Sequence, residues 1–399
     1  MGLRFLTAGE SHGAALVAIL DGIPAGLSLS VEVINHDLAR RQRGFGAGPR
    51  MKIEQDRVQI LSGLMSGVTI GAPLALLVEN RDHARWRGQP IPPFTVPRPG
   101  HADLTGAIKF GFTDLRPALE RASARETTAR VAVGAVCRQF LAEYRIQVGG
   151  YVTDIGEVTS DLSEIPLGKR PFLAEASDVR CPHPKYANLM RAGIQQAIKE
   201  RETLGGIIEV VVEGLPAGLG SYTQWDRRLE SRLGAAILSI QAIKGVEIGH
   251  AFENTRRPGS QAQDAIRLNA ADPEELTAEG DIIRTSGLSG GLEGGITTGQ
   301  PLVIRAAMKP IASTLNPQQS VDLASGAETS TQYERSDFCP VPRAVVVVEA
   351  MAAFVLADAL IEKIGGDSLE EMKPRFETLR RARISDLVMD NHKHIWWPE

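Results

Sequence analysis

The segment Asp-Gly-Ile-Pro-Ala-Gly-Leu at residues 21–27 returns almost unchanged as Glu-Gly-Leu-Pro-Ala-Gly-Leu at residues 213–219. Each copy stands between an apolar run typical of a strand and a stretch rich in Leu and Arg that is typical of a helix. The strand-type runs are residues 15–20 and 207–212, and the helical stretches are residues 33–43 and 225–238. The repeated turn therefore predicts that two parts of the chain fold alike.

Two further pairs of segments follow in the same order. The spacing of Gly, Thr and Pro-Leu over residues 63–74 recurs over residues 291–302. Long helices rich in Ala and Val are predicted at residues 125–144 and 343–364, and Gly365-Gly366 is typical of a helix end. We expect a single domain over residues 1–368 and a C-terminal tail over residues 369–399. Within the domain, the related halves are expected at residues 1–145 and 205–365.

The composition of the predicted elements indicates the fold class. Helices dense in Ala and Val can be approached closely and are expected to be buried against sheets. The many hairpin-like Gly and Pro turns favour antiparallel strands. No strand–GxGxxG–helix unit is present, which disfavours a doubly wound parallel sheet. The sequence thus predicts an α/β (α+β) sandwich, with mainly antiparallel sheets packed around central long helices.

Composition and charge exclude several classes of protein. The chain has 399 residues, of which 43% are hydrophobic and 23% charged, as in a soluble globular protein. Its longest apolar run, residues 344–361, is interrupted by Glu349 and Asp358, and no secretion signal is recognised, so neither membrane nor export is expected. A net charge of −4 gives no reason to expect nucleic-acid binding. Three widely spaced cysteines fit the cytoplasm, and no metal site is expected.

The first candidate site is Gly-Glu-Ser-His-Gly at residues 9–13. Glycine allows tight turns and close approach to a ligand, and histidine exchanges protons near neutral pH. Ser11 and His12 are therefore candidate functional residues, although a polar turn with a hydrogen-bonded histidine has the same pattern. A second candidate is an anion site, because arginines interleaved with glycines can converge on one ligand. Its cations are Arg40, Arg41, Arg43, Arg50 and Lys52, although a solvated, charged helix end has the same pattern.

Two more segments combine charge with a turn or a helix start. His101 stands two residues before Asp103 in a Pro/Gly turn, which suits either an oriented acid or an exposed loop residue. Residues 121–130 open the first long helix. There Ser123 and Glu126 have the spacing of a capping box, and a helix N-terminus flanked by arginines also binds anions.

The last two candidate segments lie in the second half of the chain. Lys309 to Ser313 follows a predicted strand, where a lysine is either solvated or bound to a ligand. Arg335-Ser336-Asp337 precedes the last long helix. Its Arg and Asp form either a surface ion pair or a site in which the arginine holds a phosphate and the aspartate moves a proton.

Taken together, these motifs resemble the chorismate synthase family, over about residues 3–368. The resemblance rests on residues 9–13, 98–103, 121–130, 241–249, 290–295, 309–313, 335–337 and 349–351. It implies a carbon–oxygen lyase acting on phosphates, in the shikimate pathway of aromatic amino acid biosynthesis. The implied reaction is the anti 1,4-elimination of phosphate and a ring proton from 5-enolpyruvylshikimate 3-phosphate, which gives chorismate. The family requires reduced FMN, for which NADPH or an external flavin reductase is the expected source, and is typically a homotetramer.

The resemblance also implies roles for individual residues. His12, His101 and Asp337 match catalytic positions. Positions that match substrate contacts are Ser11, Arg41, Arg50 and Arg125. Positions that match flavin contacts are Arg121, Ala122, Ser123, Gln241, Ala242, Gly294, Lys309, Pro310, Ile311, Ala312, Ser313 and Arg335. The chain departs from the family at Ala47, where an arginine is usual, at Ala122, where serine is common, and at His183, where aspartate is usual.

Two other functions are compatible with these residues. One is an FMN-dependent oxidoreductase that acts on a phosphorylated carboxylate and consumes a nicotinamide cofactor, which the missing dinucleotide fingerprint disfavours. The other is a protein that binds a phosphorylated ligand without catalysis. Two histidines and an aspartate on three separate motifs favour proton transfer over binding alone.

Overall fold

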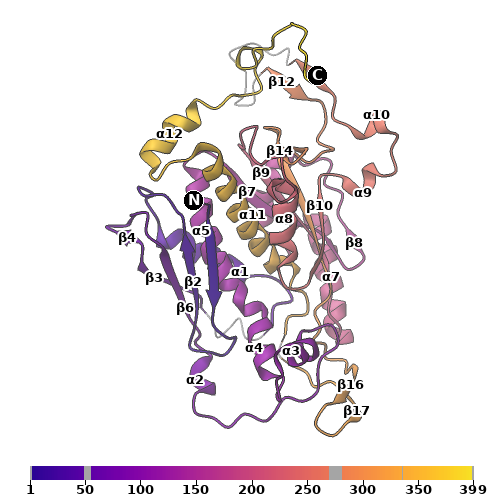
Figure 1. Cartoon of the computed structure of the whole chain (residues 1–399). Helices are drawn as coiled ribbons and strands as arrows, with labels where there is room; N and C mark the ends of the chain where they lie inside the picture. The colour runs from indigo at the N-terminus through magenta and orange to yellow at the C-terminus, as the bar shows by residue number, and fades with distance from the viewer. Residues whose placement is uncertain (1, 49–54, 269–280, 335, 398–399) are drawn as a thin grey trace.

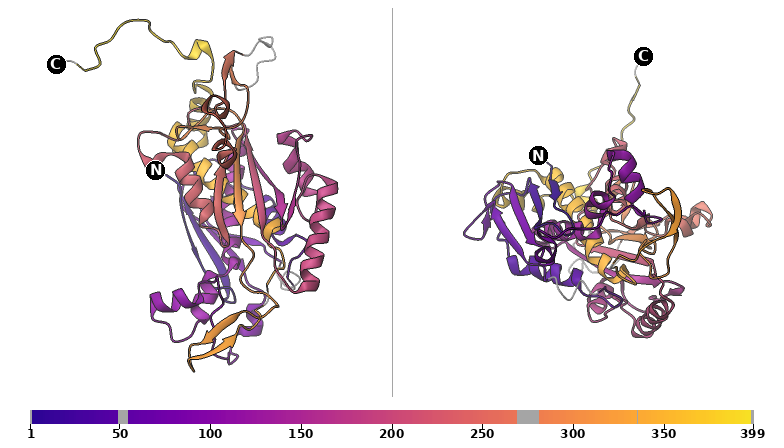
Figure 2. Two further views of the ribbon diagram at one scale, coloured as in Figure 1. Left: turned by 90° about the vertical axis from the view of Figure 1, so that its right-hand side faces the viewer. Right: turned by 90° about the horizontal axis from the view of Figure 1, so that it is seen from below.

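The protein, described here from a computed structural model, is placed for residues 2–48, 55–268, 281–334 and 336–397. Two antiparallel sheets enclose a layer of long helices (Figure 1). This agrees with the predicted class of mixed helices and antiparallel sheets. The view from the side and from below shows the same layers, with the C-terminal end of the chain reaching away from them (Figure 2). The predicted tail over residues 369–399 is wrong in its first part, because Leu369, Met372 and Phe376 of the helix Leu369–Glu377 are buried in the main core.

The first sheet is built by the N-terminal part of the chain. Its strands, in spatial order, are β1 (Arg4–Ala8), β2 (Ala15–Asp21), β6 (Leu74–Glu79) and β3 (Val58–Ser62). Alternate side chains of β2, including Leu16 and Leu20, are buried against the helices, as the two-residue period of a half-buried strand requires.

The second sheet is built by the middle and C-terminal parts. Its strands, in spatial order, are β10 (Ile243–Ile248), β15 (Leu302–Met308), β9 (Gly206–Glu213), β7 (Gln147–Ile155) and β8 (Val158–Thr159). The inner part of β9 is buried on both faces. Its outer side is covered in part by α6 (Arg170–Glu175), which packs on β7.

The central layer is dominated by α5 (Thr127–Ala142) and α11 (Val341–Ile364), which pack on each other and run side by side (Figure 1). They are flanked by α1 (Val31–Gln42) and α8 (Leu229–Leu238). Within the described residues, α11 alone is long and apolar enough to cross a membrane. However, 89% of its most apolar window is buried in the core.

The remaining elements are short or peripheral. The helices are α2 (His83–Trp86), α3 (Asp103–Phe110), α4 (Arg116–Ala122), α7 (Pro184–Glu200), α9 (Ala251–Asn254), α10 (Gly259–Ala262) and α12 (Leu369–Glu377). The 3-10 turns are η2 (Ala124–Glu126), η3 (Leu167–Lys169), η4 (Trp225–Arg227) and η6 (Ile384–Asp386). The small hairpins are β4 (Leu64–Met65) with β5 (Val68–Thr69), β11 (Ile266–Leu268) with β12 (Ile282–Arg284), β13 (Leu292–Glu293) with β14 (Ile296–Thr297), and β16 (Gln319–Asp322) with β17 (Ala327–Ser330).

The repeated turns make the same hydrogen bonds in both halves. Thr69 Oγ1 donates to the carbonyl of Pro24 at 2.6 Å, and Thr297 Oγ1 donates to the carbonyl of Pro216 at 2.6 Å. Thr69 belongs to the small hairpin that precedes β6 of the first sheet, and Thr297 belongs to the small hairpin that precedes β15 of the second sheet. The two threonine-anchored turns are therefore alike in structure as well as in sequence.

The ends of the long helices were predicted with unequal success. The end of α11 at Ile364, with Gly365 as its C-cap, is confirmed. The predicted capping box at Ser123 is wrong in part. Ser123 Oγ does accept the backbone N–H of Arg125, but it caps the 3-10 turn η2. The Glu126 carboxylate accepts hydrogen bonds from Thr7 and Arg130, and α5 begins only at Thr127.

Candidate functional site

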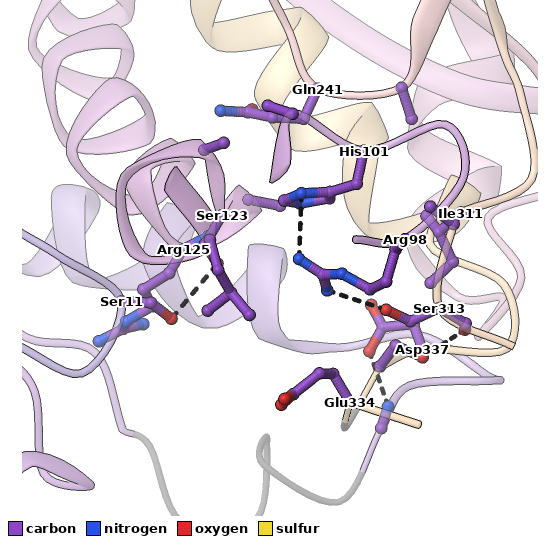
Figure 3. Close-up of a pocket in the computed structure, with 18 of the residues that line it drawn as sticks. Ser11, Arg98, His101, Ser123, Arg125, Gln241, Ile311, Ser313, Glu334 and Asp337 are labelled. Carbon is purple, nitrogen blue, oxygen red and sulfur yellow. Dashed lines mark hydrogen bonds between the residues drawn. The ribbon is translucent and has the colours of Figure 1, made fainter. Parts of the chain in front are cut away.

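Both central helices start beside one cavity. The cavity measures about 620 Å³ and is lined by residues that lead into α5, by Asp337 just before α11, and by Arg343 in its first turn. The N-terminal end of a helix carries partial positive charge, so two such ends favour an anionic ligand. Loops after β1, before α3 and after β15 complete the walls (Figure 3).

His12 lies on the loop between β1 and β2 and is held by a carboxylate. Its Nδ1 lies 2.7 Å from Glu120 Oε1, and its backbone N–H donates to Glu120 Oε2 at 2.8 Å. The indole of Trp86 lies against the other side of the imidazole, with ring centroids 4.4 Å apart. His12 is thus an oriented histidine in the wall of the cavity.

His101 is held in a similar way by Asp103. Its Nδ1 lies 2.6 Å from Asp103 Oδ1. Asp103 is fully buried and also accepts hydrogen bonds from the guanidinium of Arg98, at 2.8 and 2.9 Å. Although burial raises it, the hydrogen bonds from Arg98 and His101 hold the pKa of Asp103 well below its ordinary value. The sequence-based expectation of an oriented His101 is therefore confirmed against that of an exposed loop residue.

Buried arginines give the cavity its positive charge. Arg125 pairs with Asp56 at 2.7 Å, and Arg41 donates to Thr127 Oγ1 at 2.9 Å. Burial, followed by repulsion from Arg343, lowers the pKa of Arg41. A bound anion stabilises cations more strongly in this environment than in water, because the surrounding dielectric is low.

Asp337 and Lys309 lie on the wall built by the second half. Asp337 Oδ1 accepts the backbone N–H of Gly48 at 2.7 Å, and its other oxygen pairs with Arg343. Lys309 Nζ donates to the carbonyl of Gly100 at 2.9 Å. These contacts cross between the two halves of the chain, so the cavity exists only when both are folded together.

Gln241 supplies an acceptor that the described residues leave unused. Its Oε1 is buried and has no hydrogen-bond partner within the described parts of the chain. The next residue, Ala242, has φ +68°, a left-handed backbone conformation that is uncommon for a residue with a side chain. Both residues line the cavity (Figure 3). Such local strain beside a buried unpaired oxygen is typical of a ligand site.

The structure brings together most of the residues singled out in the sequence. Those that line the cavity are Ser11, His12, Arg41, His101, Ala122, Ser123, Arg125, Gln241, Ala242, Lys309, Ile311, Ala312, Ser313 and Asp337. Arg50, Lys52 and Arg335 lie outside the described residues.

Three of the expected flavin contacts are not in the cavity wall. Arg121 is exposed and donates to Thr7 Oγ1 at 3.0 Å. Pro310 lies between two lining residues without lining the cavity itself. Gly294 lies in the turn between β13 and β14, where an added Cβ would have no atom within 4 Å. That hairpin is at the upper end of the molecule, whereas α4, which carries Ala122, is at the lower end (Figure 1).

Arg40 also differs from expectation. It does not line the cavity and instead pairs with Glu349 at 2.7 Å inside the helical layer. The reason is helical geometry, since adjacent residues near the end of α1 point about 100° apart. Arg41 therefore faces the cavity while Arg40 faces α11.

Other lining residues were missed. Arg98 belongs to a motif that was recognised, but no role was given to it. Trp86, Glu334 and Arg343 line the cavity as well. Arg343 follows a Pro at the start of α11, and nothing in the local pattern distinguishes it from a solvated arginine.

Four arginines, a lysine and two carboxylate-paired histidines in one cavity define an enzyme that acts on an anionic substrate and moves protons. Comparisons with known proteins give the family: the family model for chorismate synthase matches residues 3–361. The chain belongs to the chorismate synthase family, and it is a lyase.

Curated relatives and a solved structure agree with this assignment. The chorismate synthase of Chlorobaculum tepidum is 49% identical, with 95% of this chain and 98% of that protein covered. The chorismate synthase of Aquifex aeolicus is 51% identical, with 94% and 96% covered. A crystal structure of a chorismate synthase superposes with a TM-score of 0.76 at 45% identity, covering 94% of this chain and 97% of that one.

Proposed function

We propose that the cavity between the two helix starts is where this chain eliminates phosphate and a ring proton from 5-enolpyruvylshikimate 3-phosphate to form chorismate. The observation that carries the proposal is the meeting of two carboxylate-paired histidines with four arginines in one cavity of about 620 Å³. The substrate carries a phosphate and two carboxylates, which match guanidinium groups in charge and geometry. A volume of this size is ordinary for the site of a small organic ligand.

Arg41, Arg125 and Arg343 are the side chains we assign to the anionic groups of the substrate. Their charge offsets the negative charge that grows on the phosphate as it leaves, and the helix N-termini add to this effect. Since Arg125 and Arg41 are already held by Asp56 and Thr127, little reorganisation accompanies substrate binding. Ser11, whose Oγ lies 3.3 Å from Ser123 Oγ, adds a hydroxyl to the same wall.

His12, His101 and Asp337 are the residues we assign to proton transfer. Each histidine has its Nδ1 at a carboxylate, so proton exchange with a ligand uses the other ring nitrogen. Asp337 offers carboxylate oxygens in the wall of the same cavity, where it is oriented by Gly48 and Arg343. Proton transfer by positioned groups of this kind contributes roughly 10²–10⁴-fold to a rate.

The residues present fit a bound flavin. Gln241 Oε1, which has no partner within the described residues, offers an acceptor to a ring N–H, and the neighbouring Ala242, with its left-handed backbone, also lines the cavity. Residues that would hold FMN are Ala122, Ser123, Gln241, Ala242, Lys309, Ile311, Ala312 and Ser313. Reduced FMN, when bound, supplies electron-rich chemistry to the elimination and is returned reduced, because the overall reaction is redox-neutral.

The decisive assay measures phosphate release from 5-enolpyruvylshikimate 3-phosphate under anaerobic conditions, with dithionite-reduced FMN and then with oxidised FMN. We expect release, together with chorismate absorbance, only with reduced FMN, and the flavin should remain reduced throughout. Consumption of one NADPH per turnover would identify the alternative, an FMN-dependent oxidoreductase. Binding without any release would identify a ligand-binding protein.

We also propose the setting in which the enzyme works. It is a cytoplasmic homotetramer without nucleic-acid or membrane partners, and its reduced FMN comes from NADPH directly or through an external flavin reductase. An assay with NADPH and FMN, without dithionite or added reductase, separates these two sources.

We further infer that the two halves of the domain arose by duplication. The matched threonine-anchored turns and the strand orders β1-β2-β6-β3 and β7-β9-β15-β10 support this. Because β7 (Gln147–Ile155) takes the place of β1 in the second order, the second half includes residues before the predicted boundary at 205.

A further inference from the structure

Glu120, on α4, makes three hydrogen bonds to the loop that carries His12. Its backbone carbonyl accepts from the N–H of Ser11 at 3.1 Å. Its Oε2 accepts from the backbone N–H of His12 at 2.8 Å, and its Oε1 lies 2.7 Å from His12 Nδ1. Only 13% of the Glu120 side chain and 15% of the His12 side chain are exposed, so water competes weakly for these bonds.

The far side of His12 is held as firmly by α2. The Trp86 ring lies against the imidazole with centroids 4.4 Å apart. His83 Nδ1 lies 2.9 Å from the backbone carbonyl of His12, which can only accept. The imidazole is thus bound at Nδ1 by a carboxylate and packed against an indole.

The chemistry of Glu120 decides which nitrogen of His12 carries hydrogen. Although burial raises it, the hydrogen bonds from His12 lower the pKa of Glu120, so the side chain is a carboxylate at neutral pH. A carboxylate only accepts hydrogen bonds. The nitrogen at 2.7 Å must therefore be the donor, and His12 carries its hydrogen on Nδ1.

We infer that Glu120 is a positioning residue for the reaction, which fixes the Nδ1–H tautomer and the orientation of His12 so that proton exchange with a cavity ligand runs through Nε2. The inference rests on the proposed role of His12. The arrangement parallels the carboxylate that orients a catalytic histidine in serine hydrolases.

The pairing of His101 differs in one respect. Asp103 divides its hydrogen bonds between His101 and Arg98, whose guanidinium also lies 3.0 Å from His101 Nδ1. Both side-chain oxygens of Glu120, by contrast, are directed at His12. Glu120 therefore acts on one histidine alone, which makes its replacement a clean test.

The first measurement is the tautomer of His12, by ¹⁵N NMR of the full-length enzyme labelled at histidine, at about pH 8.5, where an ordinary imidazole is neutral. The His12 signals are identified by their absence in His12→Ala. We expect a pure Nδ1–H pattern in the wild type and a mixture of tautomers in Glu120→Gln, because one of the two oxygens that accept from His12 is replaced by an NH2 group, which only donates. Glu79→Gln, an exposed carboxyl change on β6, should leave the pattern unchanged.

The second measurement is steady-state kinetics of phosphate release with reduced FMN. Glu120→Gln should lower kcat by about 10- to 100-fold and leave KM within about twofold. The expected loss is a fraction of the rate acceleration that a positioned acid or base provides. Glu120→Asp keeps the charge at a shorter reach and should lie between Gln and wild type. If Glu120→Gln fails to fold, the same measurements are made on Glu120→Asp.

The outcomes separate the two claims. A His12 ring that stays purely Nδ1–H in Glu120→Gln, or a kcat within twofold of wild type, would overturn the positioning role. Full activity of His12→Ala would instead overturn the proposed function of His12, and the NMR result would still decide what Glu120 does to the ring.

Discussion

Asp103 shows how much one side chain organises in this site. It is fully buried and accepts hydrogen bonds from the backbone and guanidinium of Arg98 and from His101 Nδ1. Removing one partner of a buried pair leaves the other charge uncompensated, which is costly. Asp103 is thus expected to matter for stability as well as for the orientation of His101.

We predict that Asp103→Asn lowers the free energy of unfolding at pH 7 by about 3–5 kcal/mol, the usual cost of breaking a buried ion pair. Chemical denaturation measures it. As a control, Asp21→Asn removes a half-exposed partner of Arg4 and should cost less than about 1 kcal/mol. Equal effects of the two changes would show that the Arg98–Asp103 pair is not buried as described.

The Arg98–Asp103 pair also predicts how the stability of the protein depends on pH. Because the folded protein lowers the pKa of Asp103, its contribution to stability is fully present above the ordinary carboxyl pKa of about 4. The contribution is lost as the pH falls through the lower folded value. The difference in unfolding free energy between wild type and Asp103→Asn should therefore be constant from about pH 7 to 5 and shrink below about pH 4. A difference that grew on acidification would contradict the assignment.

Side chains close together in the sequence could be predicted, and distant ones could not. His101 and Asp103 are two residues apart, and the pairing was anticipated as one of two alternatives. Glu120 and His12 are 108 residues apart, and no local pattern joins them. Arg343 likewise reaches Asp337 only because α11 starts at the cavity.

At the scale of elements, the contact between α5 and α11 depends on small residues. A Cβ placed on Gly134 would lie 2.3 Å from the Cβ of Ala350, closer than any real contact allows. The two helices therefore approach each other with no room for a methyl group at this crossing.

We predict that Gly134→Ala destabilises the protein by about 1–3 kcal/mol, because an added methyl group must push the helices apart. Gly193→Ala in α7 is the matched control, since nothing lies within 4 Å of a Cβ there. It should stabilise by up to about 1 kcal/mol, the gain of alanine over glycine in a helix. Unfolding curves of both variants test this, and a stabilised Gly134→Ala would refute the close packing.

Helices were easier to predict than their first turns. The apolar content of residues 341–364 and the glycines that follow indicate both the helix and its end. The start of α5 depends on tertiary contacts instead, because Glu126 turns away from Ser123 to bind Thr7 and Arg130. Local patterns cannot include a partner that arrives from another strand.

At the scale of the whole molecule, Glu349 joins the two halves. It lies in the middle of α11, is 1% exposed, pairs with Arg40 of α1 at 2.7 Å and accepts the N–H of Gly150 of β7 at 2.8 Å. Arg138 of α5 lies 3.5 Å away. In the sequence Glu349 only interrupts an apolar run, whereas in the fold it connects three helices and a strand.

We predict that Glu349→Gln costs about 3–5 kcal/mol of unfolding free energy, because Arg40 and Arg138 lose a buried counter-charge and only Asp37 and Glu175 remain beside Arg40. Glu362→Gln, on the same helix, removes a half-exposed partner of Arg227 and should cost less than about 1 kcal/mol. Thermal or chemical unfolding of the pair provides the comparison. A neutral Glu349→Gln would show that the ion cluster around Glu349 does not hold the halves together.

The layered architecture could be predicted from the repeated turns and helices, since each repeat indicates a sheet with a helix to cover. The ion cluster around Glu349 could not, because Arg40 is 309 residues away. The cavity itself was anticipated only through resemblance. Its walls come from both halves, and their meeting is a property of the folded chain.

The central claim is that His12 and His101 move protons in this cavity. The most direct test is the kcat of phosphate release with reduced FMN for His12→Ala and His101→Ala, with the exposed His250→Ala as control. We expect a fall of at least about 100-fold for each cavity variant and wild-type turnover for the control. Turnover within twofold of wild type in both cavity variants would contradict it.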